Sequence, residues 1–201
     1  MKKQRNLVAE LTDRELVLNV YLTQAIMLVL ALLIGFVVFD QWLDFFLLFE
    51  TELTWLLLIG GGVALVVVGI DLLLEHLLPK KWLDDGGINE RVFRNLSLPQ
   101  LFILCAVVAF AEELLFRAVI QTAFGLVIAS VIFALIHIRY LDKPVLFFNV
   151  CLVSFLLGAL FYWTEMIMIT IFAHFLIDFL LGLVLRNRYK NKIQVEEGVR
   201  T

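Results

Sequence analysis

Charged residues are scarce in this chain. Asp, Glu, Lys and Arg make up 17% of its 201 residues, whereas hydrophobic residues make up 62%. Soluble domains are nearer half apolar and about a quarter charged, so a core of this size cannot bury the excess. The composition predicts an integral membrane protein whose surroundings are the lipid bilayer. A net charge of −3 provides no basic surface, and no nucleic-acid partner is expected.

Cysteine is also scarce. Cys105 and Cys151 both fall inside apolar runs and show no CxxC spacing. The sequence therefore predicts neither a disulfide framework nor redox chemistry. Both are expected to pack as small apolar side chains. A cleavable signal peptide is not expected either, because the first apolar stretch begins near Leu16, is too long, and lacks a small-residue cleavage site.

Long apolar runs, by contrast, fill most of the chain. A helix needs about 20 apolar residues to cross roughly 30 Å of hydrocarbon. Five stretches are long enough, and a sixth at 125–138 is short. The sequence therefore predicts an all-α fold, a polytopic membrane helical bundle with about six transmembrane helices. The five long stretches are 16–39, 53–78, 100–124, 145–163 and 166–185.

Basic and acidic residues divide between the two ends of these stretches. Fifteen of the sixteen Lys and Arg residues lie near the two termini or in the loops at 79–99 and 139–144. The connections on the other side carry only acidic charges, at Asp40, Asp44, Glu50, Glu52 and Glu165. The positive-inside rule then places both termini in the cytoplasm. The chain is expected to be a multi-pass protein of the cell membrane.

Six ionisable residues lie deep inside the predicted spans. An Asp, Lys or Arg at the middle of a membrane helix costs roughly 2.5–3.5 kcal/mol, so such residues are candidates for function. The third span contains three of them, the fourth ends with one, and the sixth contains two. In chain order they are Glu112, Glu113, Arg117, His137, His174 and Asp178.

Helical spacing gives the residues of the third span different roles. Glu113 and Arg117 are four residues apart and can pair on one face of a helix, whereas Glu112 points about 100° away. We expect Glu113 and Arg117 to form a structural pair. We expect Glu112 to face a cavity, where a glutamate among apolar groups suits the role of general base.

The other three residues can meet Glu112 from two further helices. His174 and Asp178 share a face because they are four residues apart, and His137 ends the fourth span. Together they predict a common site that activates a water molecule, although a single histidine at a span end is often only interfacial. A further acidic and histidine group at 71–76 is interpreted as an anchor at the membrane interface rather than as a metal or substrate site.

Three motifs follow one another along these spans. Residues 112–117 match EExxxR, residues 133–137 match FxxxH, and residues 174–178 match HxxxN/D. In this order, each inside a predicted span, they resemble the CPBP family of CAAX proteases and bacteriocin-processing enzymes, also called the Abi family.

The resemblance divides the chain into three parts. It covers 100–185, which corresponds to the four-helix catalytic core of the family. Residues 1–99 then form two N-terminal transmembrane helices with a cytoplasmic interfacial loop, and 186–201 form a basic cytoplasmic tail.

The resemblance implies an intramembrane glutamic endopeptidase, similar to a CAAX prenyl protease, that cuts a peptide or membrane-anchored protein substrate. Glu112 would activate water with help from His137, and His174 with Asp178 would bind the scissile carbonyl and its oxyanion. Eukaryotic members of the family have asparagine where Asp178 stands. A carboxyl group donates a hydrogen bond only when it is protonated, so Asp178 is alternatively expected to orient His174.

Three alternatives remain open. Two histidines and a carboxylate are credible zinc ligands, but no HExxH is present, and a reaction without metal or cofactor is favoured. A non-catalytic bacteriocin-immunity or membrane scaffold protein of the same family is disfavoured because unused charges are costly in lipid. A proton-coupled transporter would show inverted repeats and broken helices, and the sequence indicates neither.

Overall fold

The chain folds into helices throughout the part that the structure describes. The structure is a computed structural model, and it describes residues 10–198. Over that range it contains α-helices, π-helices and 3-10 helices but no strand. The all-α prediction is confirmed.

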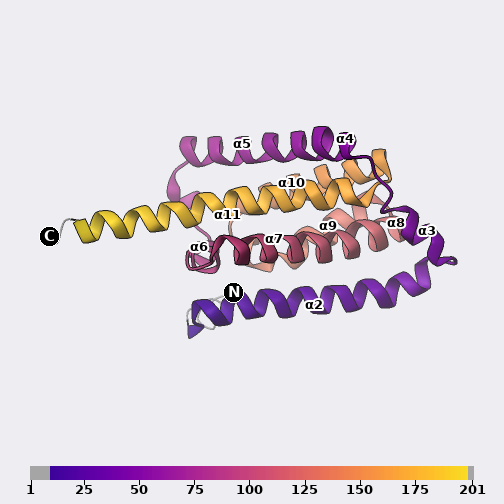
Figure 1. Cartoon of the computed structure of the whole chain (residues 1–201), viewed down its shortest axis with the longest axis horizontal. Coiled ribbons are helices and arrows are strands. Elements are labelled where there is room, and N and C mark those ends of the chain that lie inside the picture. Colours follow the sequence, from indigo (N-terminus) through magenta and orange to yellow (C-terminus); the bar gives the residue numbers. More distant parts are fainter. Residues whose placement is uncertain (1–9, 199–201) are drawn as a thin grey trace.

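Six helical segments, five long and one short, form the body of the described chain and run roughly parallel to its long axis (Figure 1). The first five coincide within a few residues with the predicted apolar stretches, whereas α11 begins as expected but continues past residue 185 to Gly198. In order they are α2 (Asp13–Val38); α4 (Leu53–Trp55), η1 (Leu56–Gly60) and α5 (Gly61–Leu77); α7 (Leu98–Glu113), η3 (Leu114–Gln121) and α8 (Thr122–Phe124); α9 (Leu126–Ile136); α10 (Pro144–Thr164); and α11 (Ile167–Gly198). The short connecting helices are α3 (Trp42–Leu47), η2 (Lys80–Trp82), α6 (Ile88–Phe93) and η4 (Ile138–Tyr140).

Local sequence signals set several helix ends. At the start of α2 the Thr12 hydroxyl accepts a hydrogen bond from the Glu15 backbone N–H, and the Glu15 carboxylate accepts one from the Thr12 N–H. Ser97 and Gln100 form the same reciprocal pair at the start of α7. Each pair satisfies two N–H groups that a helix start leaves free. Gly125 joins α8 to α9 with a φ of 85°, a conformation that glycine adopts without strain.

Four of the segments are long and apolar enough to cross a membrane. They are α2, the α4–η1–α5 segment, α10 and the apolar part of α11. Helix α9 is apolar but has only 11 residues, and the segment at 98–124 carries three charged residues near its middle. Length and composition thus support four candidate spans, and the count of six stays a prediction.

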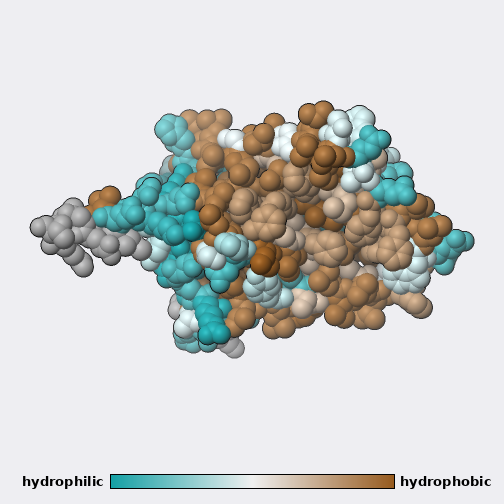
Figure 2. Space-filling model, in the orientation of Figure 1, coloured by the Kyte–Doolittle hydropathy of each residue, from teal (hydrophilic) through white to brown (hydrophobic). Residues whose placement is uncertain are grey.

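The surface fits an apolar environment. Large hydrophobic side chains are exposed along the outer helices, among them Phe36 (72%), Leu58 (71%) and Val37 (81%). Figure 2 shows a broad apolar belt across the middle of the visible face, with hydrophilic residues gathered toward the two ends. A soluble protein would not expose so large an apolar surface, so the chain is a membrane protein.

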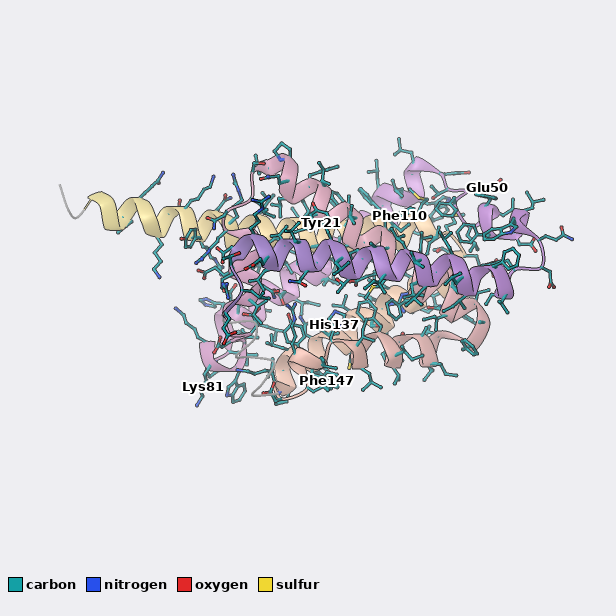
Figure 3. All side chains as sticks on the ribbon, turned by 90° about the horizontal axis from the view of Figure 1, so that it is seen from below. Tyr21, Glu50, Lys81, Phe110, His137 and Phe147 are labelled. Carbon is teal, nitrogen blue, oxygen red and sulfur yellow. The ribbon has the colours of Figure 1, made fainter. Side chains whose placement is uncertain are left out.

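The two ends of the bundle differ in charge. Helix α2 begins and α11 ends at the same end of the molecule (Figure 1). Lys81 lies at this end and Glu50 at the opposite one, with His137 between them (Figure 3). This separation agrees with the charge pattern of the loops. Which end faces the cytoplasm stays a prediction.

The α7–η3 segment forms the centre of the bundle. Helix α7 packs against both α2 and α11, and η3 packs against α2 and α9. All eight residues of η3 are buried. π-Helices are rare and often occur at functional sites, and this one directly follows Glu113.

Close packing between the α4–η1–α5 segment and α11 depends on one glycine. A Cβ atom on Gly60 would lie 3.0 Å from the carbonyl oxygen of Ile169 and 3.2 Å from the ring of Phe172. A Cβ atom on Gly62 would have no other atom within 4 Å.

We expect Gly60→Ala to destabilise the protein by about 1–3 kcal/mol, the usual effect of overpacking. Gly62→Ala is the matched control and should leave stability unchanged or slightly raised, because Ala favours helix. Thermal unfolding in one detergent compares them, and equal Tm values would contradict this packing.

Candidate active site

A cavity of about 950 Å³ lies among the helices. Its lining contains all four residues that were predicted to carry a reaction: Glu112 from α7, His137 at the end of α9, and His174 and Asp178 from α11. The same cavity extends to the charged loop at 80–90. The structure therefore brings the four residues to one space that is continuous with the polar end of the bundle.

Glu113 and Arg117 lie behind this lining with fully buried side chains. Arg117 Nε is 3.3 Å from Glu113 Oε2, which is the pairing that their spacing predicted. The guanidinium group also donates to the hydroxyl oxygens of Ser130 at 3.4 Å and Ser154 at 3.1 Å. Arg117 thus connects η3 with α9 and α10. Buried charges are tolerated only where such partners replace the lost water.

His174 lies among three carboxyl groups. Its Nδ1 is 2.9 Å from Glu113 Oε1, and its Nε2 is 3.6 Å from Asp178 Oδ2 and 4.0 Å from Glu112 Oε2. An ionised carboxylate can only accept, so Nδ1 carries a hydrogen and donates it to Glu113, while Nε2 faces the other two groups. Glu113 therefore binds His174 as well as Arg117. The four-residue spacing within the third span predicted the contact with Arg117 but not the one with His174.

Glu112 is held by a residue that the sequence analysis missed. The Gln24 side chain of α2 donates from Nε2 to Glu112 Oε1 at 3.1 Å. Both side chains are buried, with 4% of Gln24 and 7% of Glu112 exposed. The available signal was an amide side chain inside the first apolar stretch, where a polar group needs a partner.

His137 has a defined hydrogen-bonding state. Its Nδ1 is 2.8 Å from the carbonyl oxygen of Phe133, and a carbonyl oxygen can only accept. Nδ1 therefore carries a hydrogen, and Nε2 of the neutral ring is free to accept one. The ring stacks on Tyr140 with an interplanar angle of 10°. Burial raises the pKa of Tyr140, whose hydroxyl oxygen receives hydrogen bonds from Arg139 and Asn89.

The second apolar segment contributes acidic groups to the same cavity. Asp71 and Glu75, interpreted from the sequence as interfacial anchors, both belong to the lining. Asn149 of α10 donates to Asp71 Oδ1 at 3.1 Å, and Glu75 pairs with Arg188 of α11. The sequence pattern could not show that Asp71 lies against α10 or that both side chains border the cavity.

The donor atoms do not form a ready metal site. Among residues 10–198, no three His, Cys, Asp or Glu side chains are grouped so that they can hold a metal ion. Glu113, the carboxylate nearest to His174, is already bonded to Arg117. The zinc alternative thus has no preformed ligand set in the described chain.

Comparison with known proteins agrees with the three motifs. Residues 94–180 match the family described as "Type II CAAX prenyl endopeptidase Rce1-like". A protein of Bacillus subtilis (strain 168), named "Uncharacterized protein YpbD", is 35% identical over 178 residues, which cover 89% of this chain and 94% of that protein. No solved structure matches the chain.

The buried position of Arg117 predicts a large loss of stability when its charge is removed. In Arg117→Met the Glu113 carboxylate stays buried without its cation, which costs about 3–5 kcal/mol. Adding Glu113→Gln should recover part of this loss because the uncompensated charge is then gone.

Arg188→Met is the control for this prediction, since it breaks an exposed ion pair with Glu75 that contributes little to stability. Thermal unfolding of the purified variants in detergent measures the difference. The same Tm for Arg117→Met and Arg188→Met would show that the buried pair does not stabilise the bundle.

Proposed function

The chain belongs to the Rce1-like family of type II CAAX prenyl endopeptidases, and from this premise we propose that it is a membrane-embedded glutamic endopeptidase. In this proposal Glu112 activates a water molecule that hydrolyses a peptide bond, without a metal or cofactor. The substrate is a peptide or a membrane-anchored protein that enters the cavity from its polar end. CAAX-type prenylated proteins are the substrates that the family description suggests.

The observation that supports this proposal best is that Glu112 and His174 lie close together. Both are buried, Glu112 Oε2 is 4.0 Å from His174 Nε2, and both line the cavity together with His137 and Asp178. Hydrolysis needs a base for water and a donor for the oxyanion within one dry site. In this proposal Glu112 is the base and His174 is the donor, and both side chains line the same cavity.

The first step joins water to the scissile carbonyl. The Glu112 carboxylate takes one proton from the water while the water oxygen bonds to the carbonyl carbon. His137 assists by accepting a hydrogen bond from the water through Nε2, which its bond to Phe133 leaves available. The carbonyl oxygen becomes an oxyanion.

The second step breaks the carbon–nitrogen bond. A protonated His174 donates from Nε2 to the oxyanion, and its Nδ1–H stays bonded to Glu113. Glu112 returns the proton to the leaving nitrogen, which gives an amine and a carboxylic acid. Asp178, 3.6 Å from Nε2, orients the ring in this proposal and does not itself donate.

Removal of the proposed base is the direct test. We expect Glu112→Gln to lower the cleavage rate by about 10²–10⁴-fold, because a carboxamide cannot accept the proton from water. Peptides from cells and membranes of wild type and Glu112→Gln strains are compared by mass spectrometry at matched protein levels. Fragments that vanish in the variant identify the substrate.

A second arm of this experiment repeats the comparison with a zinc chelator. Fragments that survive chelation support hydrolysis without metal, and their loss would revive the zinc alternative. Unchanged peptides, with any phenotype intact in Glu112→Gln, would contradict the protease and favour a non-catalytic immunity or scaffold protein.

The role of Asp178 is tested by two replacements. Asp178→Asn keeps a side chain of the same shape with an oxygen facing His174, and we expect it to retain most activity. Asp178→Leu removes this contact and should lower the cleavage rate by about 10²-fold through misplacement of the ring. Rates on the fragments identified above measure both. A fully active Asp178→Leu would exclude Asp178 from the mechanism.

A further inference from the structure

Helix α2 presents one narrow face to the rest of the bundle. Only four of its residues are buried, namely Leu16, Gln24, Ala31 and Gly35. Three of them are apolar or small, as expected where a membrane helix packs closely. Gln24 is the exception, and it lies beside Glu112 although α2 is outside the segment at 94–180 that matches the family.

The chemistry of the contact fixes how the Gln24 amide is turned. An ionised Glu112 can only accept, so the NH₂ group of Gln24 must face it. The Gln24 carbonyl oxygen then points elsewhere, and it is buried with no hydrogen-bond partner in the described chain. An unpartnered buried acceptor destabilises the folded state. The one hydrogen bond of the amide to another side chain is the bond to Glu112.

Because of this contact, the two oxygens of Glu112 have different surroundings. Oε1 is bonded to Gln24, while Oε2 faces His174 and the cavity. We propose that Gln24 is a positioning residue, which fixes the Glu112 carboxylate so that Oε2 is presented to the attacking water. This inference rests on the proposed function of Glu112 as the base. It makes α2 a part of the active-site scaffold.

The comparison of two glutamines tests this inference. Gln121 is also buried, has an unpartnered carbonyl oxygen and donates from Nε2, but to the Gly158 backbone, and it does not line the cavity. Gln24→Met and Gln121→Met therefore remove the same chemical group from two buried sites. Only the first removes a donor from Glu112.

The first readout is the cleavage of fragments that depend on Glu112. We expect Gln24→Met to lower kcat by about 10- to 100-fold, the loss that one hydrogen bond to a charged group produces, with KM little changed. The Tm should change by a similar amount in the two variants, because each loses one buried donor and one unpartnered acceptor. Gln121→Met should keep its kcat per folded molecule.

The second readout needs no substrate. Dicyclohexylcarbodiimide reacts with protonated carboxyl groups in apolar surroundings, and mass spectrometry locates the adduct on Glu112. Loss of the amide donor disfavours the ionised form, so the pH at which labelling is half-maximal should rise in Gln24→Met and not in Gln121→Met. The other charged groups that face Glu112 are Glu113, His174 and Asp178, and all are kept in both variants.

The outcomes separate this inference from the proposed function. A Gln24→Met protein with wild-type kcat, or with an unshifted labelling curve, would overturn the positioning role even if Glu112→Gln is inactive. A shifted curve shows that Gln24 stabilises the ionised form of Glu112. If wild type cleaves nothing, the proposed function fails and the positioning role fails with it. If Gln24→Met does not accumulate in membranes, Gln24→Asn replaces it, since its amide is one methylene too short to reach Glu112.

Discussion

The buried carboxylate of Glu113 is the group on which the rest of the site depends. One of its oxygens is bonded to Arg117 and the other to His174. Arg117 continues the network to serines of α9 and α10. A single carboxylate therefore connects four helices that, among apolar side chains alone, could pack in several rotations. Because each member of such a network is costly when left unpaired, the arrangement is favoured only as a whole.

The same network explains why two adjacent glutamates differ. Glu113 points into the bundle, where one of its oxygens is bonded to Arg117 and the other to His174. Glu112 precedes Glu113 by one residue and therefore points in another direction. It accepts one hydrogen bond, from the uncharged amide of Gln24, and its Oε2 lies 4.0 Å from His174 Nε2. An oxygen with unused accepting capacity in a cavity is what a general base requires. In the proposed mechanism, Glu112 rather than Glu113 is the base because Glu113 is already bonded to Arg117 and His174.

Much of this arrangement could be predicted from the sequence because it depends on spacing along single helices. The Glu113–Arg117 pair and the closeness of His174 and Asp178 follow from four-residue steps. Contacts between helices depend on the rotation of each helix about its axis, which spacing does not report. The bond from His174 to Glu113 was missed for this reason. The hydrogen bond from Asn149 of α10 to Asp71 of α5 also joins two helices and was not predicted for the same reason.

The contact between Gln24 and Glu112 joins the N-terminal part of the chain to the part that carries the motifs. Helix α2 lies against both α7 and η3. In a lipid surrounding, apolar faces of helices gain little from each other, and small residues with a few directional bonds determine which helices associate. Ala31 and Gly35 allow α2 to approach, and Gln24 supplies a directional bond at the depth of the site. A helix placed in this way is coupled to the proposed base, so a shift or rotation of α2 would first change the position of Glu112.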